Sequence, residues 1–253
     1  MTIRHPRRLP LLALGMLALL TGLWAGLARL GWDVPLPRPG FSSLHGPLMV
    51  SGFLGTLISL ERAVALGQSW AYAAPLLTGL GALTLIAGGP LVAAQLLMLG
   101  GSAGLVAIFA AIIRRHPALY TCTMGSGAVV WALGNLLWLL GWPVFLVVFW
   151  WAAFLVVTIA GERLELARLQ QVTPGAQTAF LLFLGTLLAS LVLLGWWFDG
   201  AVRVFGAALT ALALWLGFND IARRTVRQTG LTRFIAVCLL SGYGWLGVSG
   251  LAA

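Results

Sequence analysis

Charged residues are scarce in this sequence, and lysine is absent altogether. Only 8% of the 253 residues are charged while 60% are hydrophobic, whereas a soluble globular domain carries about 25% charged residues. Such a chain cannot cover a water-facing surface with polar groups. Together with a mean hydropathy of +1.00, this composition predicts that most of the outer surface faces lipid, and it excludes an ordinary soluble domain.

Several sequence motifs of known chemistry are also missing. The two cysteines, Cys122 and Cys238, form no C-x-x-C pair and no C-x-x-C-H haem-attachment site, which excludes a disulfide framework and a c-type haem. There is no Walker loop, no G-x-S-x-G and no H-E-x-x-H. These absences leave no motif that would predict a nucleotide-binding fold, a serine hydrolase or a zinc protease.

Long apolar runs dominate what is present. Nine of them are separated by short breaks that contain Arg, Pro or Gly, at residues 10–31, 45–66, 71–89, 91–113, 119–140, 144–161, 176–197, 201–218 and 232–253. Each run is far longer than a barrel strand and none alternates, so helices are the expected spanning form. We therefore predict an all-α, polytopic transmembrane helical bundle of about nine spans, with residues 1–253 as a single transmembrane domain.

The distribution of arginine predicts the orientation of these spans. All but three of the 15 arginines lie in the N-terminal tail or in breaks on the same side of the bundle, and the exceptions are Arg29, Arg38 and Arg203. By the positive-inside rule this places the N-terminus in the cytoplasm. The net charge of +9 is thereby explained by membrane orientation, so we expect no nucleic-acid partner.

The second apolar run carries the first candidate site. On a helical wheel, one narrow face holds His45, Met49, Gly52, Thr56 and Ser59, and small and polar groups of this kind usually face the interior of a bundle. An imidazole and a thioether at i and i+4 suit a single soft metal, either copper or haem iron. The alternative is structural, with the imidazole hydrogen-bonded to a neighbour and the methionine packed.

The number of histidines limits the kind of haem site. His5 lies in the basic tail and His116 lies beside two arginines, so both belong to the predicted cytoplasmic side, whereas His45 belongs to the outer side. This chain therefore cannot supply two axial histidines near its outer face. Either a methionine, for which Met49 is the candidate, serves as the second ligand, or the second ligand lies in sequence beyond this chain.

The cytoplasmic ends of two spans share the pattern I-x-x-E-R, which gives the pairs Glu61–Arg62 and Glu162–Arg163. Acids this close to the membrane serve either in ion pairs or in proton coupling. Because adjacent residues do not face each other on a helix, each glutamate is expected to pair with an arginine from another helix.

Two segments carry a resemblance to a known family. Residues 45–53 (HGPLMVSGF) resemble the early H-x-H-E-M-x-x-G-F motif of the NnrS family, and residues 242–246 (GYGWL) are similar to a G-Y-x-W-L segment of that family. Its members are multi-pass bacterial membrane proteins described as containing haem and copper and linked to nitric oxide and nitrosative stress. They have about twelve spans, so the resemblance implies that this chain corresponds to the N-terminal two thirds of such a protein.

The sequence departs from the family pattern at three positions. The second histidine and the glutamate of the motif correspond to Pro47 and Leu48, and the histidine expected before the tyrosine of the last span is replaced by Leu240. Only His45 and Met49 therefore carry over as candidate metal ligands.

Three functional hypotheses follow. The resemblance implies an NnrS-like protein of the bacterial inner membrane that binds haem or copper near the periplasmic face. A proton-coupled transporter or permease without metal would instead use the glutamates of the two I-x-x-E-R patterns. A structural subunit of a larger membrane complex is the third hypothesis, and a homo-oligomer is compatible with each. The sequence gives no indication of a small-molecule substrate.

Overall fold

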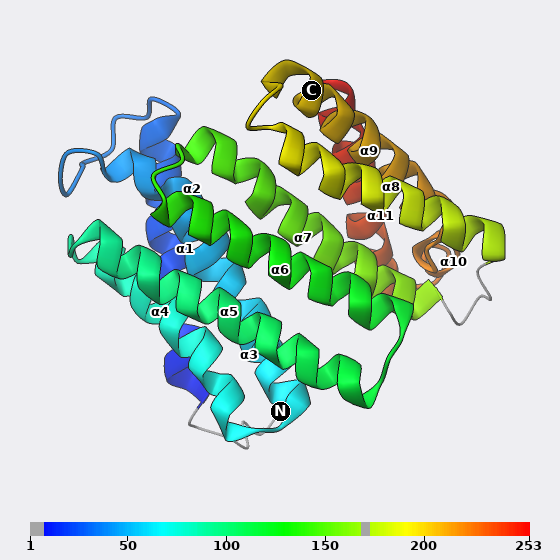
Figure 1. Ribbon diagram of the computed structural model, residues 1–253, viewed down its shortest axis with the longest axis horizontal. Helices are drawn as coiled ribbons and strands as arrows, with labels where there is room; N and C mark the ends of the chain where they lie inside the picture. Colours follow the sequence, from blue (N-terminus) through cyan, green and yellow to red (C-terminus); the bar gives the residue numbers. More distant parts are fainter. Residues whose placement is uncertain (1–7, 168–172) are drawn as a thin grey trace. The chain divides into compact units, whose positions relative to one another are not determined.

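The computed structural model describes residues 8–167 and 173–253, and within these ranges it contains helices and no strand (Figure 1). In this described part, nine helical segments are long and apolar enough to cross a membrane. They are α1 (Leu9–Arg29), Phe41–Leu66, Ser69–Ile86, α5 (Leu91–Arg115), α6 (Leu119–Leu139), α7 (Val144–Ala167), α8 (Pro174–Leu193), α9 (Phe198–Asn219) and α11 (Gly230–Leu251). The prediction of an all-α protein with nine apolar spans is confirmed.

Two of these segments are composite. The second consists of a 3-10 turn, η2 (Phe41–Leu44), then α2 (His45–Pro47), a π-helix, η3 (Leu48–Gly55), and α3 (Thr56–Leu66). The third consists of the 3-10 turn η4 (Ser69–Tyr72) and α4 (Ala73–Ile86), and the short helix α10 (Ala222–Thr225) separates α9 from α11. The second span is thus continuous, but its hydrogen-bonding pattern changes twice along its length.

Glycines allow the sharp reversals between spans. Gly67 ends α3 with φ of 69°, and Gly141 follows α6 with φ of 90°. Both values lie in the left-handed region, which a residue with a side chain rarely adopts. The backbone therefore turns at these positions within one or two residues, and adjacent spans connect through short breaks.

The chain divides into two compact units. Unit 1 comprises Met1–Pro117 and Gly125–Phe154, and unit 2 comprises Ala118–Met124 and Leu155–Ala253. The helices α6 and α7 therefore contribute to both. The description of residues 1–253 as a single transmembrane domain stays a prediction.

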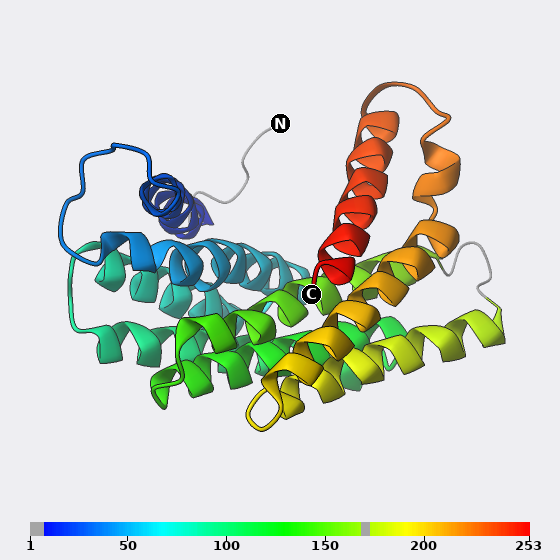
Figure 2. The ribbon, with the colours of Figure 1, turned by 90° about the horizontal axis from the view of Figure 1, so that it is seen from above.

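In unit 1, α1 lies over the second span (Figure 2), and α4 packs against α5 (Figure 1). Large side chains fill the interior between these helices and the unit-1 part of α6 and α7. The fully buried ones include Leu48, Met98, Leu105, Trp131 and Trp151. This core encloses the face of the second span opposite to α1.

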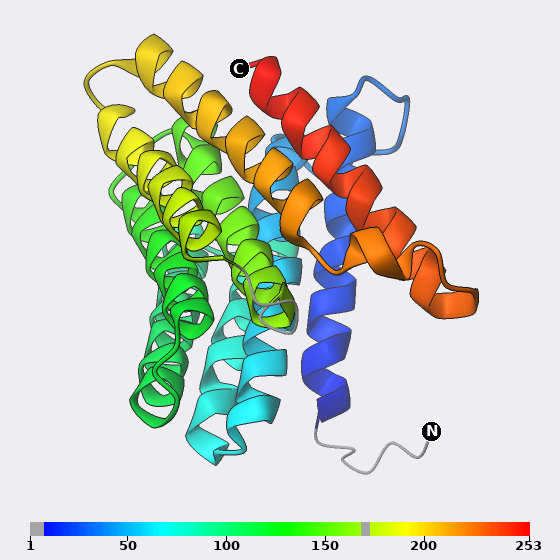
Figure 3. The same cartoon turned by 90° about the vertical axis from the view of Figure 1, so that its right-hand side faces the viewer.

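In unit 2, α9 packs against both α8 and α11, and α9 and α11 run antiparallel (Figure 3). Small residues bring α9 and α11 close together: the Thr210 hydroxyl, which also bonds within α9, lies 3.4 Å from the Gly247 carbonyl oxygen. Phe180 of α8 packs on Trp215 of α9 with ring centroids 4.8 Å apart. Close approach through small residues is the usual means of helix association in lipid, where burial of apolar surface provides no driving force.

Candidate functional site

His45 lies at the start of the second span, in α2, and is half-buried against α1. Its Nδ1 atom is 2.9 Å from the carbonyl oxygen of Gly22. A carbonyl oxygen can only accept a hydrogen bond, so Nδ1 carries the proton and donates it. In the neutral imidazole the lone pair is then on Nε2, which is the arrangement found in histidines that bind metals through Nε2 while a second group orients the ring.

Met49 follows one turn later and contacts α1 at the same place. A Cβ atom on Gly22 would lie 2.9 Å from the Met49 sulfur, and a Cβ atom on Gly26 would lie 2.7 Å from His45 Nδ1. The two side chains therefore occupy the space that a glycine pair, spaced i and i+4 on α1, leaves open. The structure places both predicted ligands against α1, where Gly22 provides the carbonyl for His45 and the space for Met49.

The residues present favour some metals over others. An imidazole nitrogen and a thioether sulfur are a soft pair that suits copper(I), and haem iron also accepts a His–Met pair. Among the described residues, no group of three or more His, Cys, Asp or Glu side chains could hold a metal ion. His116 follows the last turn of α5, next to Arg114 and Arg115, and His5 lies outside the described residues. His45 and Met49 thus fit a two-ligand site for copper(I) better than a bis-histidine haem.

The rest of the predicted polar face of the second span points inward, as expected. Ser59 and Thr56 are buried, and Gly52 fits between Ala18 of α1 and Ala82 of α4, to which an added Cβ would lie 3.1 and 2.9 Å away. The Thr56 hydroxyl donates a hydrogen bond to the Thr78 hydroxyl at 3.0 Å. This face serves helix packing from Gly52 onward.

The prediction that Glu61 pairs with an arginine from another helix is wrong. Its carboxylate lies 3.2 Å from a guanidinium nitrogen of Arg62, the next residue. Adjacent helical residues start about 100° apart, but both side chains are long enough to meet beyond the helix surface. The Glu61 side chain is 62% exposed, whereas that of Arg62 is 14% exposed and its guanidinium lies 5.9 Å from the centre of the Phe109 ring of α5. The carboxylate therefore lies at the surface, and the arginine packs against the bundle.

Arg163, by contrast, pairs with an acid that is distant in the sequence. In unit 2 its Nε atom lies 3.9 Å from the carboxylate of Asp220, which directly follows α9. The pairing expected for Glu162 stays a prediction, and Arg168, in the break that follows, lies outside the described residues.

The core of unit 1 contains a hydrogen-bonded network that could not be predicted from the sequence. Asn135 of α6 accepts hydrogen bonds through Oδ1 from the Ser51 hydroxyl at 3.1 Å and from Trp151 Nε1 at 3.0 Å. Trp131 Nε1 donates to the Ser51 oxygen at 3.1 Å. All four side chains are fully buried. Because these polar atoms satisfy one another, the network contributes a specific packing of the second span against α6 and α7.

A family described as a domain of unknown function (DUF8744) matches residues 8–253. No curated protein and no solved structure matches the chain.

Proposed function

The chain belongs to the DUF8744 family, and we propose that it is a multi-pass protein of the bacterial inner membrane that binds copper(I) or haem iron through His45 and Met49. One observation carries the proposal. The carbonyl oxygen of Gly22 in α1 accepts a hydrogen bond from the His45 imidazole. The missing side chain of Gly22 leaves room for the sulfur of Met49, which lies one turn after His45. A histidine fixed at Nδ1 presents its Nε2 lone pair in a defined direction, which reduces the entropy lost when a metal binds.

The orientation of the protein is part of the same proposal. The N-terminus lies in the cytoplasm, because all but three of the 15 arginines fall on that side. His45 is then near the periplasmic face. Kinship with the NnrS family, and with it a link to nitric oxide or nitrosative stress, follows from the resemblance of residues 45–53 and 242–246 alone.

The exposed carboxylate of Glu61 has a different role in this proposal. A carboxylate that is 62% exposed and paired with the next residue is suited to anchoring the end of a span among lipid headgroups. It is poorly suited to carrying protons through the bundle, since a proton carrier normally faces the interior or a water-filled cavity. The structure therefore gives the transporter hypothesis no specific support at Glu61.

The test is a titration of the purified full chain with copper(I) against a chromophoric copper(I) chelator, together with an absorption spectrum after expression with haem supply. We expect either one copper(I) bound per chain or a Soret band. The affinity for copper(I), or the intensity of the Soret band, should fall at least about tenfold in His45→Ala and in Met49→Ala, since each variant removes one of two ligands.

Two matched variants control for nonspecific effects. Met16→Ala removes an exposed methionine of α1, and His116→Ala removes the imidazole at the other end of unit 1. Both variants should bind copper(I) or haem as the wild type does. A metal-free, colourless wild type, or equal binding by wild type and His45→Ala, would show that the proposal is wrong.

A further inference from the structure

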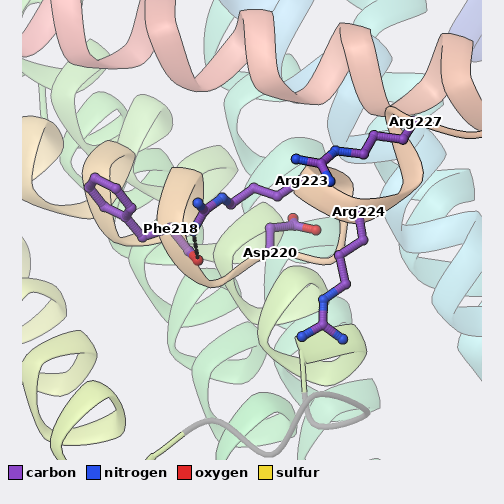
Figure 4. A pocket seen from close by; sticks show the side chains of 5 residues that line it. All are labelled: Phe218, Asp220, Arg223, Arg224 and Arg227. Carbon is purple, nitrogen blue, oxygen red and sulfur yellow. Dashed lines mark hydrogen bonds between the residues drawn. The ribbon is translucent and has the colours of Figure 1, made fainter.

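A basic cavity lies where α9 ends in unit 2. It has a volume of about 390 Å³ and is lined by Phe218, Asp220, Arg223, Arg224 and Arg227 (Figure 4). This volume lies within the range of about 300–1,000 Å³ that is usual for small-ligand sites. The cavity is separate from the His45 site, which belongs to unit 1.

The single acid of the cavity is already neutralised by groups of the protein. The Asp220 side chain is fully buried; its Oδ1 atom accepts a hydrogen bond from the Ala222 amide at 2.8 Å. Its Oδ2 atom accepts a hydrogen bond from the Tyr243 hydroxyl and lies 3.9 Å from Arg163 Nε. The negative charge of Asp220 is therefore neutralised by Arg163, and it does not neutralise the three arginines that line the cavity.

These three arginines are available to a ligand. Arg223 is held in place, because it donates to the Phe218 carbonyl at 2.9 Å and its guanidinium lies 5.5 Å from the centre of the Phe218 ring. Arg224 and Arg227 have no ion pair or hydrogen bond from their side chains to any residue in 8–167 or 173–253. In Figure 4 Arg223 turns toward Phe218, while Arg224 and Arg227 extend on opposite sides of the Asp220 carboxylate. The lining of the cavity thus carries three arginines, and its one carboxylate is already paired with Arg163.

An apolar groove lies on the other side of Tyr243. It has a volume of about 180 Å³, and its lining includes Leu216, Cys238, Leu239, Gly242 and Leu246 beside Tyr243. Tyr243 lines this groove, and its hydroxyl donates a hydrogen bond to the carboxylate of Asp220, which lines the basic cavity. A basic cavity and an apolar groove that share one Tyr–Asp pair match the two halves of a phospholipid.

We propose that the basic cavity binds a phosphate group, carried by an anionic phospholipid whose acyl chain lies in the apolar groove. Guanidinium groups bind phosphate oxygens in a fork geometry with charge-assisted hydrogen bonds. Arginine clusters at the end of a membrane span are also placed at headgroup depth. Free phosphate has the same charge chemistry but would make no use of the groove.

The first arm of the test measures lipid. The full chain is placed in nanodiscs that contain phosphatidylglycerol and phosphatidylcholine, and retained lipid is counted by native mass spectrometry. Wild type should retain phosphatidylglycerol, and the double variant Arg224→Gln, Arg227→Gln should retain it about tenfold less or worse, as expected when charged hydrogen bonds are lost. Arg114→Gln, Arg115→Gln, at the exposed end of α5, makes the same change in net charge and should behave as wild type.

A second pair of variants tests the groove. A Cβ atom added at Gly242 or at Gly244 meets no atom within 4 Å, so both helical positions have room for the start of a side chain. Only Gly242 lines the groove. Gly242→Leu should therefore reduce phosphatidylglycerol retention, whereas Gly244→Leu should not.

The second arm titrates inorganic phosphate into nanodiscs of phosphatidylcholine alone. One outcome is that wild type binds phosphate, that the double arginine variant does not, and that Gly242→Leu retains as much phosphatidylglycerol as wild type. The cavity then binds a soluble phosphate, and the acyl-chain part of the proposal is overturned. If neither lipid retention nor phosphate binding differs between wild type and the double arginine variant, the whole proposal is overturned. Neither result depends on whether His45 binds metal.

Discussion

The Nε1 atom of Trp151 donates a hydrogen bond to Oδ1 of Asn135 at 3.0 Å, in a region of unit 1 where both side chains are fully buried. The same oxygen accepts from Ser51, which lies 84 residues earlier in the chain. One amide therefore ties the second span to α6 and α7. In a bilayer the alternative to such a bond is a polar group without a partner, so the network specifies which faces of these helices meet.

Replacing Asn135 by leucine should destabilise the protein. Asn135→Leu leaves the Trp151 N–H and the Ser51 O–H without their acceptor, and a buried polar group that loses its partner costs about 1–3 kcal/mol. Unfolding in detergent, followed by tryptophan fluorescence, measures the loss. Asn219→Leu is the matched control, because within residues 8–167 and 173–253 the Asn219 amide bonds only to a carbonyl of its own helix, that of Trp215. Equal stability of the two variants would contradict the assigned role of the network.

The lengths of the spans, but not this network, could be predicted from the sequence. In lipid every backbone polar group must bond within its own helix, so an apolar run of sufficient length predicts a span almost by itself. The sixth predicted span still ended too early, at residue 161, since α7 continues to Ala167. Its last turns carry Glu162 and Arg163, and charged side chains at an interface do not end a helix.

Side-chain partners across the bundle depend on information that a helical wheel does not contain. The wheel correctly placed Gly52, Thr56 and Ser59 on a buried face. It assumed regular α-helix, whereas η3 is a π-helix over Leu48–Gly55, whose bonds run from i to i+5 and therefore shift the faces. Ser51 reaches α6 from this segment, and only the packed structure shows that Asn135 and Trp131 are its hydrogen-bond partners.

The glycine pair on α1 leads to a prediction about the candidate metal site. Gly26→Ala would bring a methyl group to 2.7 Å from His45 Nδ1, so the imidazole must move away from the Gly22 carbonyl. We expect weaker copper(I) binding and a loss of about 1–3 kcal/mol in the free energy of unfolding, as is typical of overpacking. The copper(I) titration and the fluorescence unfolding experiment measure both effects.

The control for this variant is Gly185→Ala on α8, where an added Cβ meets no atom within 4 Å. Alanine is favoured over glycine in an open helical position by about 0.5–1 kcal/mol, so this variant should be neutral or slightly stabilising and should leave copper(I) binding unchanged. A Gly26→Ala variant that binds copper(I) as well as Gly185→Ala does would exclude a role for the α1 contact in the site.

The Tyr243–Asp220 hydrogen bond should stabilise unit 2. Tyr243→Phe removes a donor to a buried carboxylate, and hydrogen bonds to charged groups contribute about 1.5–3 kcal/mol. We expect a loss of stability in this range by fluorescence-monitored unfolding. Tyr72→Phe, in η4 of unit 1, removes the hydroxyl of a half-buried tyrosine that has no ionic partner in the described part of the chain, and it should change stability by much less. The assignment fails if the two variants unfold alike.

The proposed orientation can be tested without purification. Alkaline phosphatase is active only when it is exported, so its activity reports the side of the membrane to which a fusion point belongs. Fusions after Gly89 and Gly141 should be active and fusions after Gly67 and His116 inactive, because the arginine-rich breaks stay in the cytoplasm. Each fusion point lies in a break between described spans. Fusions of a cytoplasmic reporter at the same points should give the opposite pattern. An inverted result would place the His45 site at the cytoplasmic face, where the reducing environment keeps copper as copper(I), and would move the proposed phosphate site to the periplasm.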